Sequence, residues 1–136
     1  MTMPLQAGHL GAAPRILVVD DEASIRDLCA RVLTRNGFEV TMASTGEDAM
    51  ARLQDAPYDL VISDIRMPGI SGMDVLARAK ALYPSIAVIL ITGFGTSEFA
   101  DRANQSGAAR ILTKPFDALE LLATVRKILA KNGHSH

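Results

Sequence analysis

The side chains best suited to chemistry in this chain stand at or just after the ends of short apolar segments. They are Asp20, Asp21, Asp64, Thr92 and Lys114. Three ionised carboxylates brought together repel one another, and a divalent cation that prefers oxygen ligands, such as Mg²⁺, relieves that repulsion. An aspartate beside such a cation can attack phosphorus and become an acyl phosphate. A hydroxyl and an ammonium can then bind the phosphoryl oxygens, so the residue types predict a phosphoryl-transfer site.

Taken singly, each of these residues has a simpler interpretation. An aspartate after a strand usually caps a helix or stabilises a turn. Asp21 could cap the helix that follows it, although Asp20 or Ser24 could do so equally well. A lysine before a proline is usually a solvated side chain. The joint site is favoured because polar functional groups follow four of the apolar segments at the same end.

The segments that would position these side chains alternate between two patterns. Apolar or alternating runs predict strands at residues 15–19, 38–42, 60–62, 86–91 and 110–113. Apolar residues at helical spacing predict a first helix with the face Ile25, Leu28, Cys29, Val32 and Leu33. Four more helices are expected: after the N-cap Thr45, at residues 71–82, at residues 97–106, and after the cap Asp117.

Such alternation, with short connections, requires parallel strands and right-handed helical crossovers. We therefore predict an α/β fold, a doubly wound five-stranded parallel sheet with five helices. Ligand sites in these folds lie beyond the carboxyl ends of the strands, which is where the polar residues fall.

Length and composition restrict the class of protein. The chain has 136 residues, of which 49% are hydrophobic and 21% charged, with a net charge of −1. This is about one domain, too apolar for a disordered chain and without a basic footprint for nucleic acid. No apolar run approaches the ~18 residues of a membrane span, and the first residues lack the features of a secretory signal. The single cysteine excludes an internal disulfide, so a soluble, cytoplasmic domain is expected.

Four motifs, in order, resemble the receiver domain of two-component response regulators. They are Ile16-Leu-Val-Val-Asp-Asp-Glu22, Asp59-Leu-Val-Ile-Ser-Asp-Ile-Arg-Met-Pro-Gly-Ile-Ser-Gly-Met-Asp74, Ile91-Thr92-Gly93 and Lys114-Pro115-Phe116. The resemblance implies a flavodoxin-like strand order 2-1-3-4-5, as in the chemotaxis member of that family.

The same resemblance implies a role for each site residue. Asp64 matches the phosphoacceptor, and Thr92 and Lys114 match the pair that senses the phosphoryl group. For Mg²⁺, the resemblance implies Asp21 as a direct ligand, Asp20 as a ligand through water, and the backbone carbonyl of Arg66 as a third ligand.

Domain boundaries and partners follow from the resemblance as expectations. Residues 15–131 would form the receiver domain, with a disordered tail at 1–14 and a short C-terminal tail at 132–136. The phosphoryl donor would be a sensor histidine kinase or a histidine phosphotransfer protein. A downstream protein would bind the face of the fourth helix, fifth strand and fifth helix, without direct contact to nucleic acid or membrane. The domain would catalyse its own phosphotransfer and dephosphorylation without being a turnover enzyme, either as a stand-alone receiver or as part of a longer regulator or hybrid kinase.

One position departs from the family pattern. Where the family usually has a tyrosine or phenylalanine that acts as a rotamer switch, three residues before the lysine, this chain has Ile111. The loop after Thr92 or another group would have to transmit the change instead. Phe94 and Phe99 are the nearest aromatics, but ordinary packing is the favoured interpretation of both.

Two other classes of protein share part of the pattern. A nucleotide-binding domain would need glycines after the first strand, where this chain has an acidic Asp-Asp-Glu. An aspartyl-phosphate phosphohydrolase usually carries a second aspartate two positions after its nucleophile, where this chain has Arg66. Both classes are therefore disfavoured.

Overall fold

The computed structural model describes residues 13–93 and 97–131, and for residues 97–100 the backbone only. Five strands form one parallel sheet in the order β2-β1-β3-β4-β5. The strands are β1 (Arg15–Val19), β2 (Glu39–Ala43), β3 (Leu60–Asp64), β4 (Ala87–Thr92) and β5 (Arg110–Thr113). The helices are α1 (Ala23–Arg35), α2 (Gly46–Asp55), α3 (Gly72–Leu82), α4 (Ser97–Gln105) and α5 (Ala118–Lys131). The predicted fold class and strand order are confirmed.

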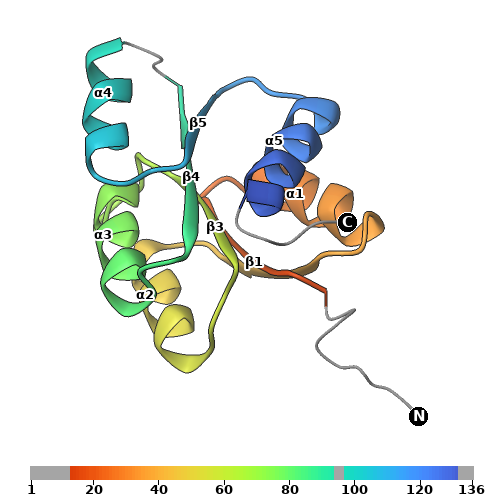
Figure 1. The fold of residues 1–136 in the computed structure, drawn as a ribbon, viewed down its shortest axis with the longest axis horizontal. Coiled ribbons are helices and arrows are strands. Elements are labelled where there is room, and N and C mark those ends of the chain that lie inside the picture. The colour runs from red at the N-terminus through yellow and green to blue at the C-terminus, as the bar shows by residue number, and fades with distance from the viewer. Residues whose placement is uncertain (1–12, 94–96, 132–136) are drawn as a thin grey trace.

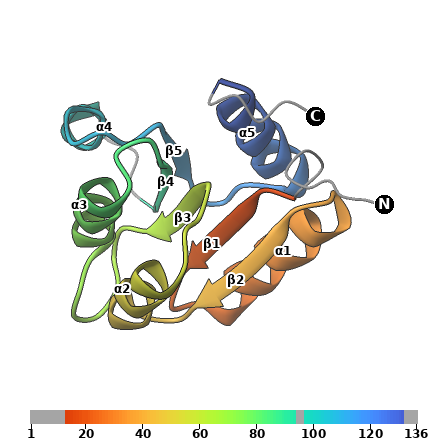
Figure 2. The ribbon, with the colours of Figure 1, turned by 60° about the horizontal axis from the view of Figure 1, so that its bottom comes forward.

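The helices cover both faces of the sheet. Figures 1 and 2 show α1 and α5 on one face and α2, α3 and α4 on the other. Two apolar clusters fill the spaces between these layers. Side chains of β4 alternate between them: Leu90 packs on the side of α2 and α3, while Ile89 and Ile91 pack on the side of α1 and α5. Strands buried on both faces explain why β1, β3 and β4 read as continuous apolar runs.

The boundaries of three strands differ from the prediction by one or two residues. β2 and β4 end one residue later than expected, at Ala43 and Thr92, and β3 ends two residues later, at Asp64. β2 begins at Glu39 and β4 at Ala87, each one residue later than expected. Ile86 stays outside β4 because its N–H donates to the carbonyl of Tyr83, which closes a turn after α3. Ile86 is predicted as a strand residue because it is apolar. It is buried, but its N–H forms the hydrogen bond of the turn rather than one of the sheet.

Local side chains define most helix ends. The Thr45 hydroxyl accepts the N–H of Asp48, and Asp117 accepts the N–H of Glu120, as predicted. Ser71 and Asp74 form a capping box at the start of α3. Gly37, which follows α1, has a φ of +91°, the left-handed conformation that commonly ends a helix. Helix α1 itself begins without a side-chain cap, and Glu22 rather than Asp21 occupies the cap position.

Cys29 is fully buried in the cluster beneath α1, where burial raises the pKa of its thiol to about 12, as suits a packed, unreactive residue. None of the helices in the described part of the chain is long and apolar enough to cross a membrane.

The start of α3 lies directly against the end of β3. The N–H of Gly72 donates to the carbonyl of Ile65, and a Cβ atom placed on Gly72 would lie 2.3 Å from the carbonyl oxygen of Asp64. That distance is far below van der Waals contact, and the obstacle is backbone. Only glycine therefore lets α3 approach Asp64 this closely.

We expect Gly72→Ala to lower the free energy of unfolding by about 1–3 kcal/mol, because the new methyl group must displace backbone at Asp64. Urea unfolding followed by circular dichroism measures this loss. Gly93→Ala is the matched control, since a Cβ there would meet nothing within 4 Å. Equal stability of Gly72→Ala and Gly93→Ala would contradict the close approach.

Candidate functional site

The carboxyl ends of the central strands bring the predicted residues together. Asp20 follows β1, Asp64 ends β3, Thr92 ends β4, and Lys114 directly follows β5. Asp20, Asp21 and Asp64 each offer a carboxylate oxygen, and these oxygens lie within 4.8 Å of one another. Thr92 is buried, and its carbonyl accepts the backbone N–H of Lys114. The parallel sheet thus gathers residues that are far apart in the sequence.

Lys114 is the cation at the centre of this cluster. Its Nζ donates to Asp64 Oδ2 at 3.0 Å and to Glu22 Oε1 at 2.5 Å, and lies 3.5 Å from Asp20 Oδ2. Burial by itself lowers the pKa of Lys114. The hydrogen bonds to Glu22 and Asp64, together with the charge of Asp20, outweigh burial and hold that pKa above its usual value. Lys114 therefore carries a full positive charge at neutral pH.

Asp20 is fully buried, and only one of its two carboxylate oxygens accepts a hydrogen bond. Its Oδ1 accepts the N–H of Glu22, whereas its Oδ2 has no hydrogen-bond partner. Burial raises the pKa of Asp20 to about 6, and the nearby charge of Asp64 adds to the increase. The contact of Oδ2 with Lys114 at 3.5 Å is an ion pair that is too long for a good hydrogen bond.

Asp64 is held from two sides. Its Oδ1 accepts the backbone N–H of Arg66 at 3.2 Å, and its Oδ2 accepts a hydrogen bond from Lys114. Its side chain is only 8% exposed. Asp21 is exposed beside it, and Arg66, whose carbonyl is the predicted third oxygen, follows Asp64 by two residues with an exposed side chain.

This donor set fits a hard divalent cation. Mg²⁺ takes oxygen ligands, usually from one or two carboxylates, and retains several waters. The cluster supplies three carboxylates, and the buried Asp20 Oδ2 is an oxygen that lacks a hydrogen-bond donor. Burying a carboxylate oxygen without a hydrogen bond lowers the stability of the folded protein. A cation bound at this edge would remove that destabilisation.

Sequence reasoning gave no role to Glu22, which makes the shortest contact of Lys114. Glu22 is part of the first motif, but the two residues are 92 positions apart, and no spacing rule links them. The only available signal was its position directly after Asp20 and Asp21, at the same edge of the sheet.

The position that usually carries an aromatic is occupied by a partly buried aliphatic side chain. Ile111 packs against the apolar cluster that contains Ala103 of α4. Phe94 and the side chain of Phe99, named above as alternatives, lie outside the described residues.

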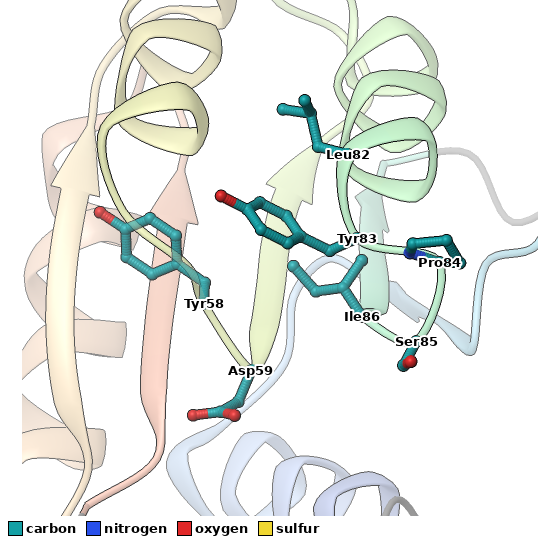
Figure 3. A pocket seen from close by; sticks show the side chains of 7 residues that line it. All are labelled: Tyr58, Asp59, Leu82, Tyr83, Pro84, Ser85 and Ile86. Atoms are coloured by element: carbon teal, nitrogen blue, oxygen red, sulfur yellow. The ribbon is translucent and has the colours of Figure 1, made fainter.

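A second concave region lies at the opposite edge of the sheet, where β3 and β4 begin. This open groove of about 590 Å³ is lined by Tyr58, Asp59, Leu82, Tyr83, Pro84, Ser85 and Ile86 (Figure 3). Its one carboxylate, Asp59, accepts the backbone N–H of Arg15. The groove contains none of the predicted site residues and no cluster of carboxylates.

Comparisons with protein-family models, curated sequences and solved structures all match response regulators or their receiver domains. The protein-family model "Response regulator receiver domain" matches residues 16–126. Transcriptional regulatory protein ZraR of Salmonella typhimurium is 38% identical over 115 residues, which are 85% of this chain and 26% of ZraR. The chain therefore spans about a quarter of the length of that relative.

Solved structures of similar length share the whole fold. A CheY-like receiver domain protein from Methanospirillum hungatei superposes with a TM-score of 0.84 at 29% identity, covering 89% of this chain and 97% of that one. The receiver domain of NtrX from Brucella abortus gives a TM-score of 0.79 at 37% identity, covering 85% of this chain and 98% of that one.

The raised pKa of Asp20 predicts that the free energy of unfolding of the metal-free protein depends on pH. Burial in the folded protein raises the pKa of this carboxyl group from 3.8 to about 6, so the free energy of unfolding falls as the pH rises through this window. Asp20→Asn removes the titrating group. We expect the free energy of unfolding of the variant, relative to that of the unmodified protein, to rise by about 1–3 kcal/mol between about pH 4 and pH 7.5.

Urea unfolding in the presence of a chelator measures this difference. Asp27→Asn, an exposed site on α1, is the matched control and should show the same offset at both pH values. A pH-independent offset for Asp20→Asn would show that Asp20 ionises without penalty.

Proposed function

The chain belongs to the response regulator receiver domain family, and from this premise we propose that Asp64 accepts a phosphoryl group from a phosphohistidine. The donor would be a sensor histidine kinase or a histidine phosphotransfer protein. The observation that carries the proposal is the contact between Asp64 Oδ2 and Lys114 Nζ inside a cluster of carboxylates. A carboxylate acts as the nucleophile, and an ammonium already in contact with it can bind the incoming phosphoryl oxygens.

Three features favour Asp64 over its neighbours as the acceptor. Asp20 is fully buried and is engaged by the N–H of Glu22. Asp21 is exposed, and no hydrogen bond in the described structure fixes its orientation toward Lys114. Asp64 combines a fixed orientation with a contact to Lys114, as nucleophilic attack in a defined geometry requires.

The remaining site residues divide the other tasks. Asp20, Asp21, Asp64 and the backbone carbonyl of Arg66 would hold Mg²⁺. When bound, Mg²⁺ neutralises the negative charge that the phosphoryl oxygens bring to the site. Lys114 supplies a further positive charge, and the Thr92 hydroxyl supplies a hydrogen-bond donor from the end of the neighbouring strand.

Receiver domains are not turnover enzymes in general, and the site supports the same statement here. Arg66 has an exposed side chain two positions after Asp64, where a phosphohydrolase would place its acid. We infer that this chain catalyses only its own phosphorylation and dephosphorylation, and that residues 15–131 form the unit that does so.

The output surface in this proposal is the face of α4, β5 and α5. Leu119 in the first turn of α5 is 80% exposed, the most exposed of the large apolar side chains in the described part of the chain. Isolated exposed leucines are common, so Leu119 is only a supporting observation for a protein partner on this face. The relatives include transcriptional regulators, and this chain could equally signal as a separate domain or within a longer protein.

We expect incubation with acetyl phosphate and Mg²⁺ to add one phosphoryl group to the protein. Intact-mass spectrometry measures the addition, which should be absent in Asp64→Asn and absent without Mg²⁺. Asp27→Asn removes an exposed carboxylate outside the site and should be labelled like the unmodified protein. Labelling of Asp64→Asn to the same extent would assign the acceptor elsewhere.

We expect Mg²⁺ to stabilise the unphosphorylated protein, because it relieves repulsion among Asp20, Asp21 and Asp64. At a concentration ten times its Kd, the gain is about 1.4 kcal/mol. A thermal scan should show a higher Tm with Mg²⁺ for the unmodified protein and for Asp27→Ala, but not for Asp21→Ala. Equal stabilisation of Asp21→Ala would remove this residue from the proposed ligands.

A further inference from the structure

Glu22 makes the shortest of the three carboxylate contacts of Lys114. The distance from Nζ is 2.5 Å to Glu22, 3.0 Å to Asp64 and 3.5 Å to Asp20. A lysine ammonium has three N–H donors and no acceptor. Two of these donors form good hydrogen bonds, one to Glu22 and one to Asp64. One of the two good hydrogen bonds of the ammonium therefore goes to a residue outside the proposed phosphoryl site.

The burial of the three partners differs strongly. The side chain of Glu22 is 56% exposed, whereas those of Asp64 and Asp20 are 8% and 0% exposed. Glu22 thus contacts Lys114 from the solvent side of the cluster. The backbone at Glu22 is fixed, because its N–H donates to Asp20 Oδ1 and its carbonyl accepts from the first turn of α1. Its side chain makes no helix-capping bond, so the contact with Lys114 is its main interaction in the described structure.

We infer that Glu22 is a positioning residue that competes with the phosphoryl group for Lys114 and thereby slows phosphorylation of Asp64. The inference rests on the proposed function, in which Lys114 binds the phosphoryl oxygens. While Glu22 holds the ammonium, one of its donors is unavailable to the incoming group. The negative charge of Glu22 also disfavours the approach of an anionic donor to this edge.

The chemical step itself needs no proton from Glu22. With acetyl phosphate as donor, a carboxylate oxygen of Asp64 forms a bond to phosphorus while the bond from phosphorus to the acetate oxygen breaks. Acetate leaves with the electron pair of the broken bond. The charge on Asp64 changes from −1 to −2, so Lys114 gains a more strongly charged partner and the bond to Glu22 becomes the weaker alternative.

The test compares the initial rate of labelling of Asp64 by acetyl phosphate and Mg²⁺, measured by intact mass at low ionic strength. Glu22→Gln keeps the shape of the side chain and removes its charge. We expect it to raise the rate about two- to fivefold, the range set by the strength of a partly exposed ion pair. Asp27→Asn makes the same change of charge at an exposed site on α1 and should leave the rate unchanged.

Two further variants separate competition for Lys114 from simple repulsion of the donor. Glu22→Asp keeps the charge but shortens the side chain, so it should also raise the rate if the contact matters. In a Lys114→Gln background the contact is already lost, and Glu22→Gln should then change the residual rate less than in the unmodified protein.

The outcomes are distinct. A rate for Glu22→Asp equal to that of the unmodified protein, or the same effect of Glu22→Gln in both backgrounds, would overturn the role of the contact. A rate for Glu22→Gln equal to or below that of the unmodified protein would overturn competition altogether. If the unmodified protein is not labelled at all, the proposed function fails, and this inference fails with it.

Discussion

Electrostatic repulsion among carboxylates at one edge of the sheet is the constraint on which the rest of the site depends. Asp20, Asp21 and Asp64 present oxygens within 4.8 Å of one another, and Glu22 adds a fourth carboxylate. Lys114 forms ion pairs with three of these carboxylates, those of Asp20, Glu22 and Asp64. Burial is the main cause of the raised pKa of Asp20, and the negative charges of Asp64 and Glu22 raise it further, against the opposing effect of Lys114. In the proposed function, a bound divalent cation would relieve this repulsion.

The fold sustains this costly arrangement through rigid supports that lie close to it. β3 is paired with β1 as far as Ser63 and with β4 through Asp64, which holds the backbone at the end of the strand in place. α3 is seated against the same residue at Gly72, with a capping box fixing its first turn. Backbone N–H groups hold one oxygen each of Asp20 and Asp64. Burial energy from two apolar clusters, rather than the site, stabilises the protein.

Sequence patterns predicted those features that depend on local or periodic rules. The strands, their parallel order and the caps at Thr45 and Asp117 follow from such rules or from the family resemblance. The gathering of Asp20, Asp64 and Lys114 also followed, because strand ends meet at one edge. The contact of Glu22 with Lys114 and the unsatisfied oxygen of Asp20 could not be predicted, since both depend on side-chain reach and orientation in three dimensions. The one-residue shift of β4 arose because Ile86 is buried like a strand residue but bonded like a turn residue.

The same contacts suggest how a change at Lys114 would reach α4 without an aromatic switch. The backbone N–H of Lys114 donates to the carbonyl of Thr92, which ties the ends of β4 and β5 to each other. Three residues before Lys114, Ile111 packs against the cluster that contains Ala103, and the N–H of Ala108 donates to the carbonyl of Ala103. A displacement of Lys114 toward a phosphoryl group would therefore act on β5, and β5 is in direct contact with α4. Since close-packed cores transmit small displacements rather than absorb them, the packing of Ile111 against this cluster would be the route by which such a displacement reaches α4.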